Sequence, residues 1–433
     1  MMSSKLILAL VLPILLANAS ARAQTATAPP DSLRRGAFLE QLQQEDFEFF
    51  ADEILAVDAA YGDSLVTRLE ELGLEGFQQL EERRSRRFDI DYGPGTRLTT
   101  FNRVEGFVAA GALDVHPLGP RGFSVTTEAG YAFSSEEPRH YSQLELPSDG
   151  DRQSSALRLH YADRVQPFGS NRIFGNGIRS LLGAADEQDY LRRRGGGGEL
   201  SWQRGRGSLS LGYEAQRETS VGVSTDIALF GELAQSNPPI DEGIDRAVVA
   251  GLSWGQRSLE QLRASLQYRV SGGGLGGEFA YNRADATLEA RRYVRRFELS
   301  SQLHYVRTGG EPPIQQLADV GGLSTVRGFP RRSRVGASSL AGRFEILVPY
   351  DVLGRLRVPL LGRTRLQFVP FADAARVYDG DSDQWIHSAG LGVQRFLGAM
   401  GRASYLRLDI SVPVGPERPA DVHFTVSFAP GLL

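Results

Sequence analysis

The chain has 433 residues, and its 48 Lys and Arg against 52 Asp and Glu give a formal net charge of −4. This balance lacks the basic excess that nucleic-acid-binding proteins show, so no nucleic-acid partner is expected. The sequence contains no cysteine, so disulfide bonds are excluded and the fold must be held by hydrogen bonds and packing.

Residues 1–23 have the three parts of a secretory signal peptide. Lys5 supplies the positive charge, residues 6–16 form an apolar core, and Ala21 and Ala23 mark the expected cleavage site. An apolar run of about 11 residues is too short to span a bilayer as a helix. We therefore expect the protein to leave the cytoplasm without a helical membrane anchor.

The next two segments are predicted to contain no strands. Residues 24–34 are rich in Pro, Ala and Thr and are predicted to be a disordered linker. Residues 35–96 are predicted to be a helical periplasmic segment, because Leu65, Leu69 and Leu72 recur at helical spacing. This segment is either a cap or linker, or a docking element for a partner or for the mouth of the next domain.

Residues 97–433 alternate apolar and polar residues between turns. In one run, Leu262 and Ala264 alternate with Arg263 and Ser265. Successive side chains of a strand point to opposite faces, so each run has one apolar and one polar face. Many such runs behind a signal peptide predict an all-β fold, a transmembrane antiparallel β-barrel. The predicted strands lie near 102–115, 123–134, 140–146, 155–165, 198–206, 208–218, 246–256, 261–271, 277–292, 296–307, 338–350, 364–378, 385–397, 404–413 and 421–428.

These ranges give an odd number of strands, whereas bacterial single-chain barrels have an even number. Sixteen strands are expected, with the missing strand in 166–197 or 220–245, and fourteen is the alternative. Ile178, Leu181 and Leu182, followed by residues 186–194, are predicted to form a short helix that ends at the four glycines of 195–198.

A short loop motif lies between two of these strands. Residues 321–329 read Gly-Gly-Leu-Ser-Thr-Val-Arg-Gly-Phe, and the specific part is Val326, Arg327, Gly328 and Phe329. This core resembles the loop motif of the BamA/TamA (bacterial surface antigen) outer-membrane barrel superfamily. Five predicted strands follow it, as in a sixteen-stranded member of that family. The other segments that resemble family strands are 101–106, 371–375, where Ala375 replaces a family Gly, and 406–409.

The resemblance covers residues 97–433 and implies an integral outer-membrane barrel with a periplasmic N-terminus. It implies a role in protein assembly or translocation, or in lipid handling, at the outer membrane. The partners implied are outer-membrane lipids, unfolded outer-membrane proteins or periplasmic factors, and the barrel-insertion machinery, of which this protein would be a client. Phe424, Val426 and Phe428 resemble the C-terminal assembly signal of such barrels.

The family mechanism would use a weak seam between the first and last strands. The predicted first strand, 102–115, is rich in Gly and Ala and contains Asp114, which favours weak pairing there. Two features depart from the family pattern. Tandem periplasmic modules are not evident before the barrel, and five residues follow Phe428 where the family usually ends on an aromatic residue.

Arg327 lies in a glycine-flanked loop, and an arginine inside a barrel lumen needs carboxylate partners because an unpaired buried charge is costly. Strand alternation directs Glu345 and Asp373 inward, so both are predicted partners of Arg327. The resemblance, which implies that the loop folds inward as a plug, adds Asp409 to these lumen partners. The alternative is that Arg327 is one of four exposed loop arginines, with Arg331, Arg332 and Arg334.

No catalytic residue, cofactor site or metal site is expected, and the protein is not expected to be an enzyme. The sequence has no Gly-x-Ser-x-Gly, no His-Glu-x-x-His and no His cluster. The main alternative function is a passive or substrate-selective outer-membrane channel. A weaker alternative is an outer-membrane lipid-modifying enzyme that uses His160 or His304 with a nearby serine. A structural or adhesin-like surface protein would need larger exposed loops.

Overall fold

The computed structural model describes residues 88–92, 96–117, 122–148, 153–169, 176–181, 186–228, 235–255, 261–295, 297–348, 366–378, 385–396, 404–415 and 422–430. The chain divides into two units, Met1–Arg86 and Arg87–Leu433, and every described residue belongs to the second. The predicted signal peptide (1–23), the predicted linker (24–34) and residues 35–87 of the predicted helical segment lie outside the described residues.

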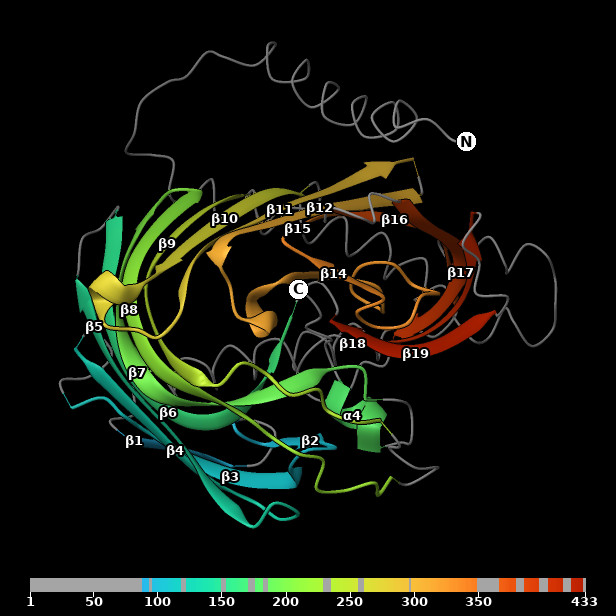
Figure 1. Cartoon of the computed structure of the whole chain (residues 1–433). Coiled ribbons are helices and arrows are strands. Elements are labelled where there is room, and N and C mark those ends of the chain that lie inside the picture. The colour runs from blue at the N-terminus through green and yellow to red at the C-terminus, as the bar shows by residue number, and fades with distance from the viewer. Residues whose placement is uncertain are drawn as a thin grey trace, which may run out of the picture. The chain divides into compact units, whose positions relative to one another are not determined.

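The described part is built almost entirely of strands (Figure 1). The strands are β1 (Phe88–Tyr92), β2 (Thr100–Asn102), β3 (Gly106–Val115), β4 (Ser124–Ala132), β5 (Glu137–Ser148), β6 (Gln153–Phe168), β7 (Asp189–Arg204), β8 (Gly207–Ser220), β9 (Gly243–Gly255), β10 (Gln261–Ser271), β11 (Ala280–Val294), β12 (Phe297–Glu311), β13 (Ala318–Val320), β14 (Arg334–Gly336), β15 (Ser338–Leu347), β16 (Gln367–Tyr378), β17 (Trp385–Phe396), β18 (Ser404–Val414) and β19 (His423–Pro430). The helices are α4 (Asn176–Leu181) and the single 3-10 turns η3 (Gly273–Leu275) and η4 (Ile314–Gln316). Among the described residues, no helix is both long enough and apolar enough to cross a membrane.

The large sheet is antiparallel. Each strand from β3 to β12 pairs with the next one, β12 pairs with β15, and each strand from β15 to β19 again pairs with the next one. The remaining edge of β3 carries both β1, with Phe88 opposite Val115, and β2, with Asn102 opposite Gly106. Counted together, β1 and β2 form one interrupted strand, and the sheet then has sixteen strands. The predicted sixteen-stranded antiparallel barrel is confirmed.

The predicted place of the sixteenth strand, in 166–197 or 220–245, is wrong. The additional strand is the pair β1 and β2, so residues 88–92 are extended although the sequence placed them in the helical segment 35–96. The predicted first strand, 102–115, is also divided, because residues 103–105 form the turn between β2 and β3. β1 has five residues and β2 has three, so each is too short for an alternating pattern to be recognised in the sequence.

The predicted helix of residues 178–194 is right only at its start: α4 includes Ile178 and Leu181, whereas β7 begins at Asp189 and includes the four glycines of 195–198. These glycines permit close approach of the neighbouring strands rather than ending a helix. A Cβ on Gly196 would lie 2.4 Å from the backbone oxygen of His160 on β6. A Cβ on Gly197 would lie 2.6 Å from the backbone oxygen of Tyr213 on β8.

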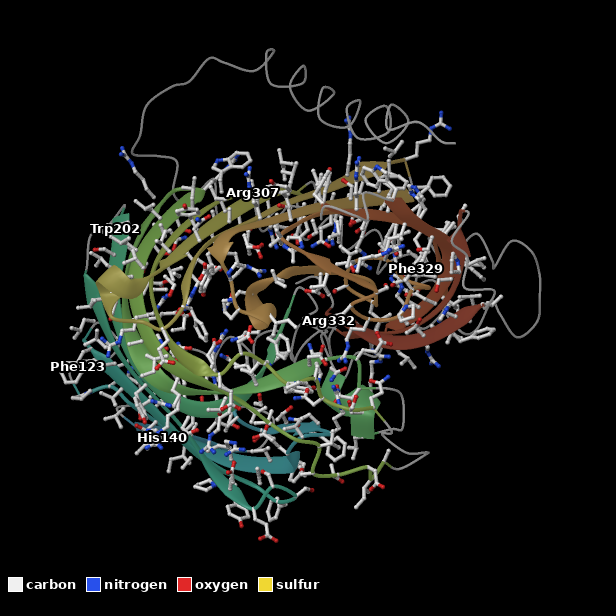
Figure 2. The ribbon with its side chains drawn as sticks, in the orientation of Figure 1. Phe123, His140, Trp202, Arg307, Phe329 and Arg332 are labelled. Carbon is white, nitrogen blue, oxygen red and sulfur yellow. The ribbon has the colours of Figure 1, made fainter. Side chains whose placement is uncertain are left out.

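The two faces of the sheet differ in polarity. On β8, Leu209, Leu211 and Tyr213 are exposed, and the residues between them face the other way. Apolar positions continue from strand to strand, because Leu209 stands opposite Leu252 and Leu252 stands opposite Leu266. Figure 2 shows Phe123 and Trp202 on the outside of the curved sheet and Phe329 and Arg332 in the space it surrounds. The sheet therefore presents an apolar outer face and encloses polar groups.

Two structural features inside and beside the sheet position the candidate site. The small sheet of β13 and β14 lies on the inner side of the wall and packs against β15 and β16 (Figure 1). In the described part of the chain, no paired register joins β19 to β1 or β2. We call this junction, between β19 on one side and β1 and β2 on the other, the seam.

Candidate functional site

The candidate site is the loop between β13 and β14, which carries the predicted motif. The backbone N–H of Gly322 donates to the oxygen of Phe329 at 3.0 Å, and this bond closes the loop into a compact turn. The Thr325 hydroxyl donates to the oxygen of Gly321 at 2.9 Å and accepts from the same residue's N–H at 2.7 Å. These local bonds fix the loop so that Arg327 is held against the wall.

Arg327 is buried, with only 1% of its surface exposed, so the alternative of a solvent-exposed loop arginine does not fit the structure. Its Nε and Nη2 donate to the two carboxylate oxygens of Asp373, each at 2.7 Å. Its Nη1 donates to Glu345 at 2.7 Å and lies 3.5 Å from Asp409. The structure thus brings together all four charged residues that the sequence analysis named. A bidentate pair of this kind fixes the orientation of the guanidinium as well as its charge.

Two further arginines of the wall complete the cluster. Arg407 donates to Glu345 at 3.0 Å and to Asp409 at 2.7 Å, and Arg343 lies 3.5 Å from Glu345 and 3.8 Å from Asp373. Three guanidinium groups therefore face three carboxylates on β15, β16, β18 and the loop. This balance is what makes burial of so many charges tolerable, since each group keeps an opposite charge nearby.

The guanidinium of Arg327 also lies over the ring of Phe371, with 3.5 Å between Cζ and the ring centroid. Burial alone would lower the pKa of Arg327, but the contacts with Asp373, Glu345 and Asp409 outweigh it and raise that pKa. The group therefore stays charged. Alternation places Arg343 on the inward face with Glu345, and Phe371 on the face of Asp373, but the sequence analysis did not identify Arg343, Arg407 or Phe371 as members of this cluster.

The apolar residues of the motif anchor the loop from the other side. Val326 is fully buried in a cluster with Val320, Ala375 and Val377, and Phe329 packs against this cluster. Gly328 has a φ of +88°, and a Cβ there would lie 3.2 Å from the Ser411 hydroxyl of β18. Glycine meets both demands, because it adopts positive φ without strain and leaves room for the strand.

Gly328→Ala is expected to lower the free energy of unfolding by about 1–3 kcal/mol, because it combines an unfavourable φ with a crowded contact. The matched control is Gly205→Ala, where φ is also positive, at +56°, but a Cβ would meet nothing within 4 Å. The check is the urea midpoint of each variant in detergent micelles. Equal losses for the two variants would show that contact with β18 contributes nothing.

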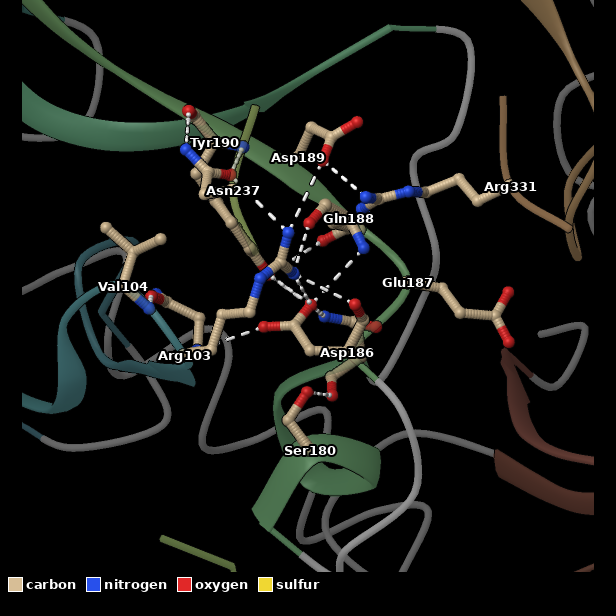
Figure 3. A network of polar contacts seen from close by, with 12 residues as sticks. Arg103, Val104, Ser180, Asp186, Glu187, Gln188, Asp189, Tyr190, Asn237 and Arg331 are labelled. Atoms are coloured by element: carbon tan, nitrogen blue, oxygen red, sulfur yellow. Dashed lines mark hydrogen bonds and ion pairs between the residues drawn. The ribbon is translucent and has the colours of Figure 1, made fainter. Parts of the chain in front are cut away.

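A second buried cluster, which the sequence analysis did not identify, surrounds Arg103 in the turn between β2 and β3 (Figure 3). The side chain of Arg103 is fully buried, and its Nη1 donates to the backbone oxygens of Asp186 at 2.9 Å and Gln188 at 2.5 Å. It forms ion pairs at 3.3 Å with the carboxylates of both Asp186 and Asp189. The only available signal was that Arg103 lies within the family-like segment 101–106, because the partners are far away in the sequence.

The other predicted residues lie apart from this site. Phe424 is on β19 and is 69% exposed, and the side chains of Val426 and Phe428 lie outside the described residues. His304 lines an internal cavity of about 530 Å³, where its Nε2 lies 2.8 Å from Asp285. His160 lines a second cavity, of about 270 Å³. In the part of the chain that the structure describes, no group of three or more His, Asp or Glu side chains is placed to hold a metal ion.

Comparison with solved structures shows the fold to be that of known outer-membrane barrels. BamA from Haemophilus ducreyi lacking POTRA domains 1–3 matches with a TM-score of 0.52 and 13% identity over 79% of this chain and 70% of that chain. CdiB from Acinetobacter baumannii matches with a TM-score of 0.41 and 13% identity, over 79% of this chain and 58% of that one. CdiB from Escherichia coli matches with a TM-score of 0.42 and 14% identity, over 82% and 70%. No protein-family model matches the sequence, and comparison with curated proteins gave no match.

Proposed function

We propose that this protein is an integral outer-membrane barrel that assists the assembly or translocation of other proteins, or the handling of lipid, at that membrane. The proposal includes a periplasmic N-terminus, delivery by the barrel-insertion machinery and no catalytic step. The fold it shares with Haemophilus ducreyi BamA supports the proposal, and the lack of strand pairing across the seam, in the described part of the chain, is the observation that carries it.

The outer face of the sheet supports a membrane location. Leu209, Leu252 and Leu266 stand opposite one another on β8, β9 and β10, and they are 50%, 55% and 45% exposed. A continuous exposed apolar row of this kind is unfavourable in water and favourable against hydrocarbon. The polar and charged groups enclosed by the sheet match the interior of a barrel.

The seam supports a role in handling extended polypeptides. β2 has only three residues, and the described part of the chain shows no register between β19 and the first strand. A strand edge without a partner offers a row of backbone donors and acceptors to another extended chain. Adding a strand to such an edge is a general mode of peptide recognition. The client would therefore be an unfolded strand-forming polypeptide.

Locking the seam is expected to abolish this activity. Thr100→Cys with Val422→Cys places one thiol on each side, and the chain contains no other cysteine to react. The measurement is the folding rate of an urea-unfolded outer-membrane protein into vesicles that contain the purified barrel. Joining the two thiols with a reducible crosslinker should lower this rate to that of empty vesicles, and reductant should restore it.

The control for the lock uses the same chemistry within a paired part of the wall. Leu252→Cys with Leu266→Cys places thiols directly opposite each other on β9 and β10. Crosslinking this pair should leave the folding rate unchanged. A locked seam that remains as fast as the open one would exclude client pairing there, and a barrel no faster than empty vesicles would exclude protein assembly itself.

A channel is the second candidate function, because the lumen holds a polar cavity. Arg269, Arg283 and Arg343 line the cavity of about 530 Å³ together with His304 and Asp285. Conductance across planar bilayers separates the two functions. A large, steady conductance of the unmodified protein would favour a channel. Little or no conductance would favour a barrel whose lumen is blocked by the inward loop.

A further inference from the structure

The seam is covered by a short helix. α4 contacts β2 on one side and β19 on the other (Figure 1). Its Gly177 faces the backbone of Phe101, where a Cβ would lie 3.1 Å from the oxygen and 3.3 Å from the nitrogen. The helix therefore reaches the first strand by close backbone approach. It occupies the position beside β2 without forming the ladder of hydrogen bonds that a strand would form.

The turn that follows β2 is held by Arg103. Besides the contacts with Asp186 and Gln188 described above, its backbone N–H donates to the Asp186 carboxylate at 3.0 Å. Asn176 of α4 donates to the same carboxylate at 2.8 Å. The first hairpin, the helix that covers the seam and the beginning of β7 are thus joined in one buried group of contacts.

Asp189 connects this group to the candidate site loop. Its carboxylate lies 3.3 Å from Arg103, 2.5 Å from Arg331 and 3.9 Å from Arg332 (Figure 3). Arg331 belongs to the same loop as Arg327, which binds β15, β16 and β18 through its three carboxylates. One loop is therefore tied to the last strands by Arg327 and to the first hairpin by Arg331.

The charges make Asp189 essential to this connection. Its side chain is 1% exposed and lies between Arg103, which is fully buried, and Arg331, which is 17% exposed. Without its negative charge, Arg331 would lose its short ion pair, and Arg103 would keep Asp186 as a partner but gain an uncompensated like charge nearby in a poorly hydrated space. Opposite charges attract more strongly there than at the surface, and like charges repel more strongly.

We propose that Asp189 is the latch of the seam: through Arg103 and Arg331 it ties the first hairpin to the loop held by the last strands. The seam is then closed by ion pairs inside the barrel and by α4, and opening it requires the Asp189 contacts to break. The consequence for client access rests on the proposed function, whereas the closure itself is a property of the fold.

The test measures the seam directly. Spin labels on Phe107→Cys of β3 and Phe424→Cys of β19 report the distance across the seam, since both side chains are exposed and the native chain has no thiol. With Asp189→Asn, pulsed electron resonance should show a new population at longer distance. We expect the open fraction to rise about tenfold or more, and a tenfold rise corresponds to about 1.4 kcal/mol.

Two further variants keep the test decisive. Arg331→Ala removes the ion pair with Asp189 from the side of the loop. Because Arg331 is less buried than Asp189, this variant should fold even where Asp189→Asn folds poorly, and it should show the same new population. Asp163→Asn is the matched control, because it removes an equivalent pair with Arg192, 2.7 Å apart, within the paired wall of β6 and β7. This control should leave the distance across the seam unchanged.

The outcomes separate the latch from the proposed function. Unchanged distances in both Asp189→Asn and Arg331→Ala, or equal widening in Asp163→Asn, would overturn the latch. Widening confined to the first two variants, together with faster folding of the unfolded client, would support both proposals. The same widening without any change in client folding would support the latch and count against the assembly role.

Discussion

Arg327→Ala is expected to destabilise the barrel by about 3–5 kcal/mol, because it leaves buried carboxylates without their shared cation. Asp373 loses the guanidinium donors to both of its oxygens and keeps the backbone N–H of residue 327, and Glu345 and Asp409 lose a neighbouring positive charge. The loop also loses its ion pairs with β15, β16 and β18. We therefore expect both a lower urea midpoint in micelles and a higher conductance in planar bilayers than the unmodified barrel shows.

Two variants show which property of Arg327 matters. Arg327→Lys keeps the charge but cannot donate two parallel bonds to Asp373, so we expect an intermediate loss of stability. Arg307→Ala removes an exposed arginine of β12 and should change little. Stability and conductance both equal to those of the unmodified protein in Arg327→Ala would rule out the inward loop as a structural plug.

Leu211→Arg is expected to prevent or slow insertion into membranes. Leu211 lies near the middle of β8, and 51% of its surface is exposed on the apolar face. An arginine on the lipid-facing side of a barrel costs about 2–4 kcal/mol at the bilayer midplane. The measurement is the fraction of refolded protein in lipid vesicles that keeps the fast gel mobility of an unheated barrel.

The control for Leu211→Arg lies on the same strand. Gln216→Arg adds an identical charge to a residue that lines the inner cavity beside Glu214. This variant should insert at nearly the unmodified yield, because the enclosed face is polar. Equal loss in both variants would mean that added charge, rather than contact with hydrocarbon, causes the defect.

The parts of this structure that the sequence predicted well depend on strict alternation. Arg343 and Glu345 share one face of β15, and alternation directs Asp373 of β16 to the same side of the wall, so two of the three carboxylates around Arg327 could be predicted from the sequence pattern. The third, Asp409, came only from the family resemblance. The long strands of the wall could be predicted for the same reason, whereas the number sixteen came from the rule that bacterial single-chain barrels have an even number of strands. Each long strand repeats the alternation of apolar and polar residues several times, so a few irregular residues do not hide it.

The parts that were predicted wrongly lack that repetition. β1 and β2 are short and are separated by Gly-Pro-Gly and a further polar stretch, so neither shows a period. In β7, three arginines followed by four glycines remove the apolar half of the alternation. The need for glycine there comes from His160 and Tyr213 on adjacent strands, which no local pattern reveals.

The cluster around Asp189 could not be predicted, because its members come from distant parts of the chain. Arg103 lies in a turn, Asp189 begins a strand, and Arg331 belongs to an inner loop. In the sequence each is one charged residue among many, and surface solvation would explain each of them equally well. Only the curvature of the whole sheet brings them together.

The shared carboxylate of Asp189 also sets an order on folding. Arg103 is made early in synthesis and Arg331 late, so the contacts that hold the N-terminal hairpin have high contact order and form slowly. Bringing Arg103 and Arg331 together closes a very long loop, which costs conformational entropy. The ion pairs with Asp189 that offset this cost can form only after Arg331 has been made. We therefore expect the ion pairs of Arg103 and Arg331 with Asp189 to be among the last native contacts to form, although Arg103 is among the first of these residues to be synthesised.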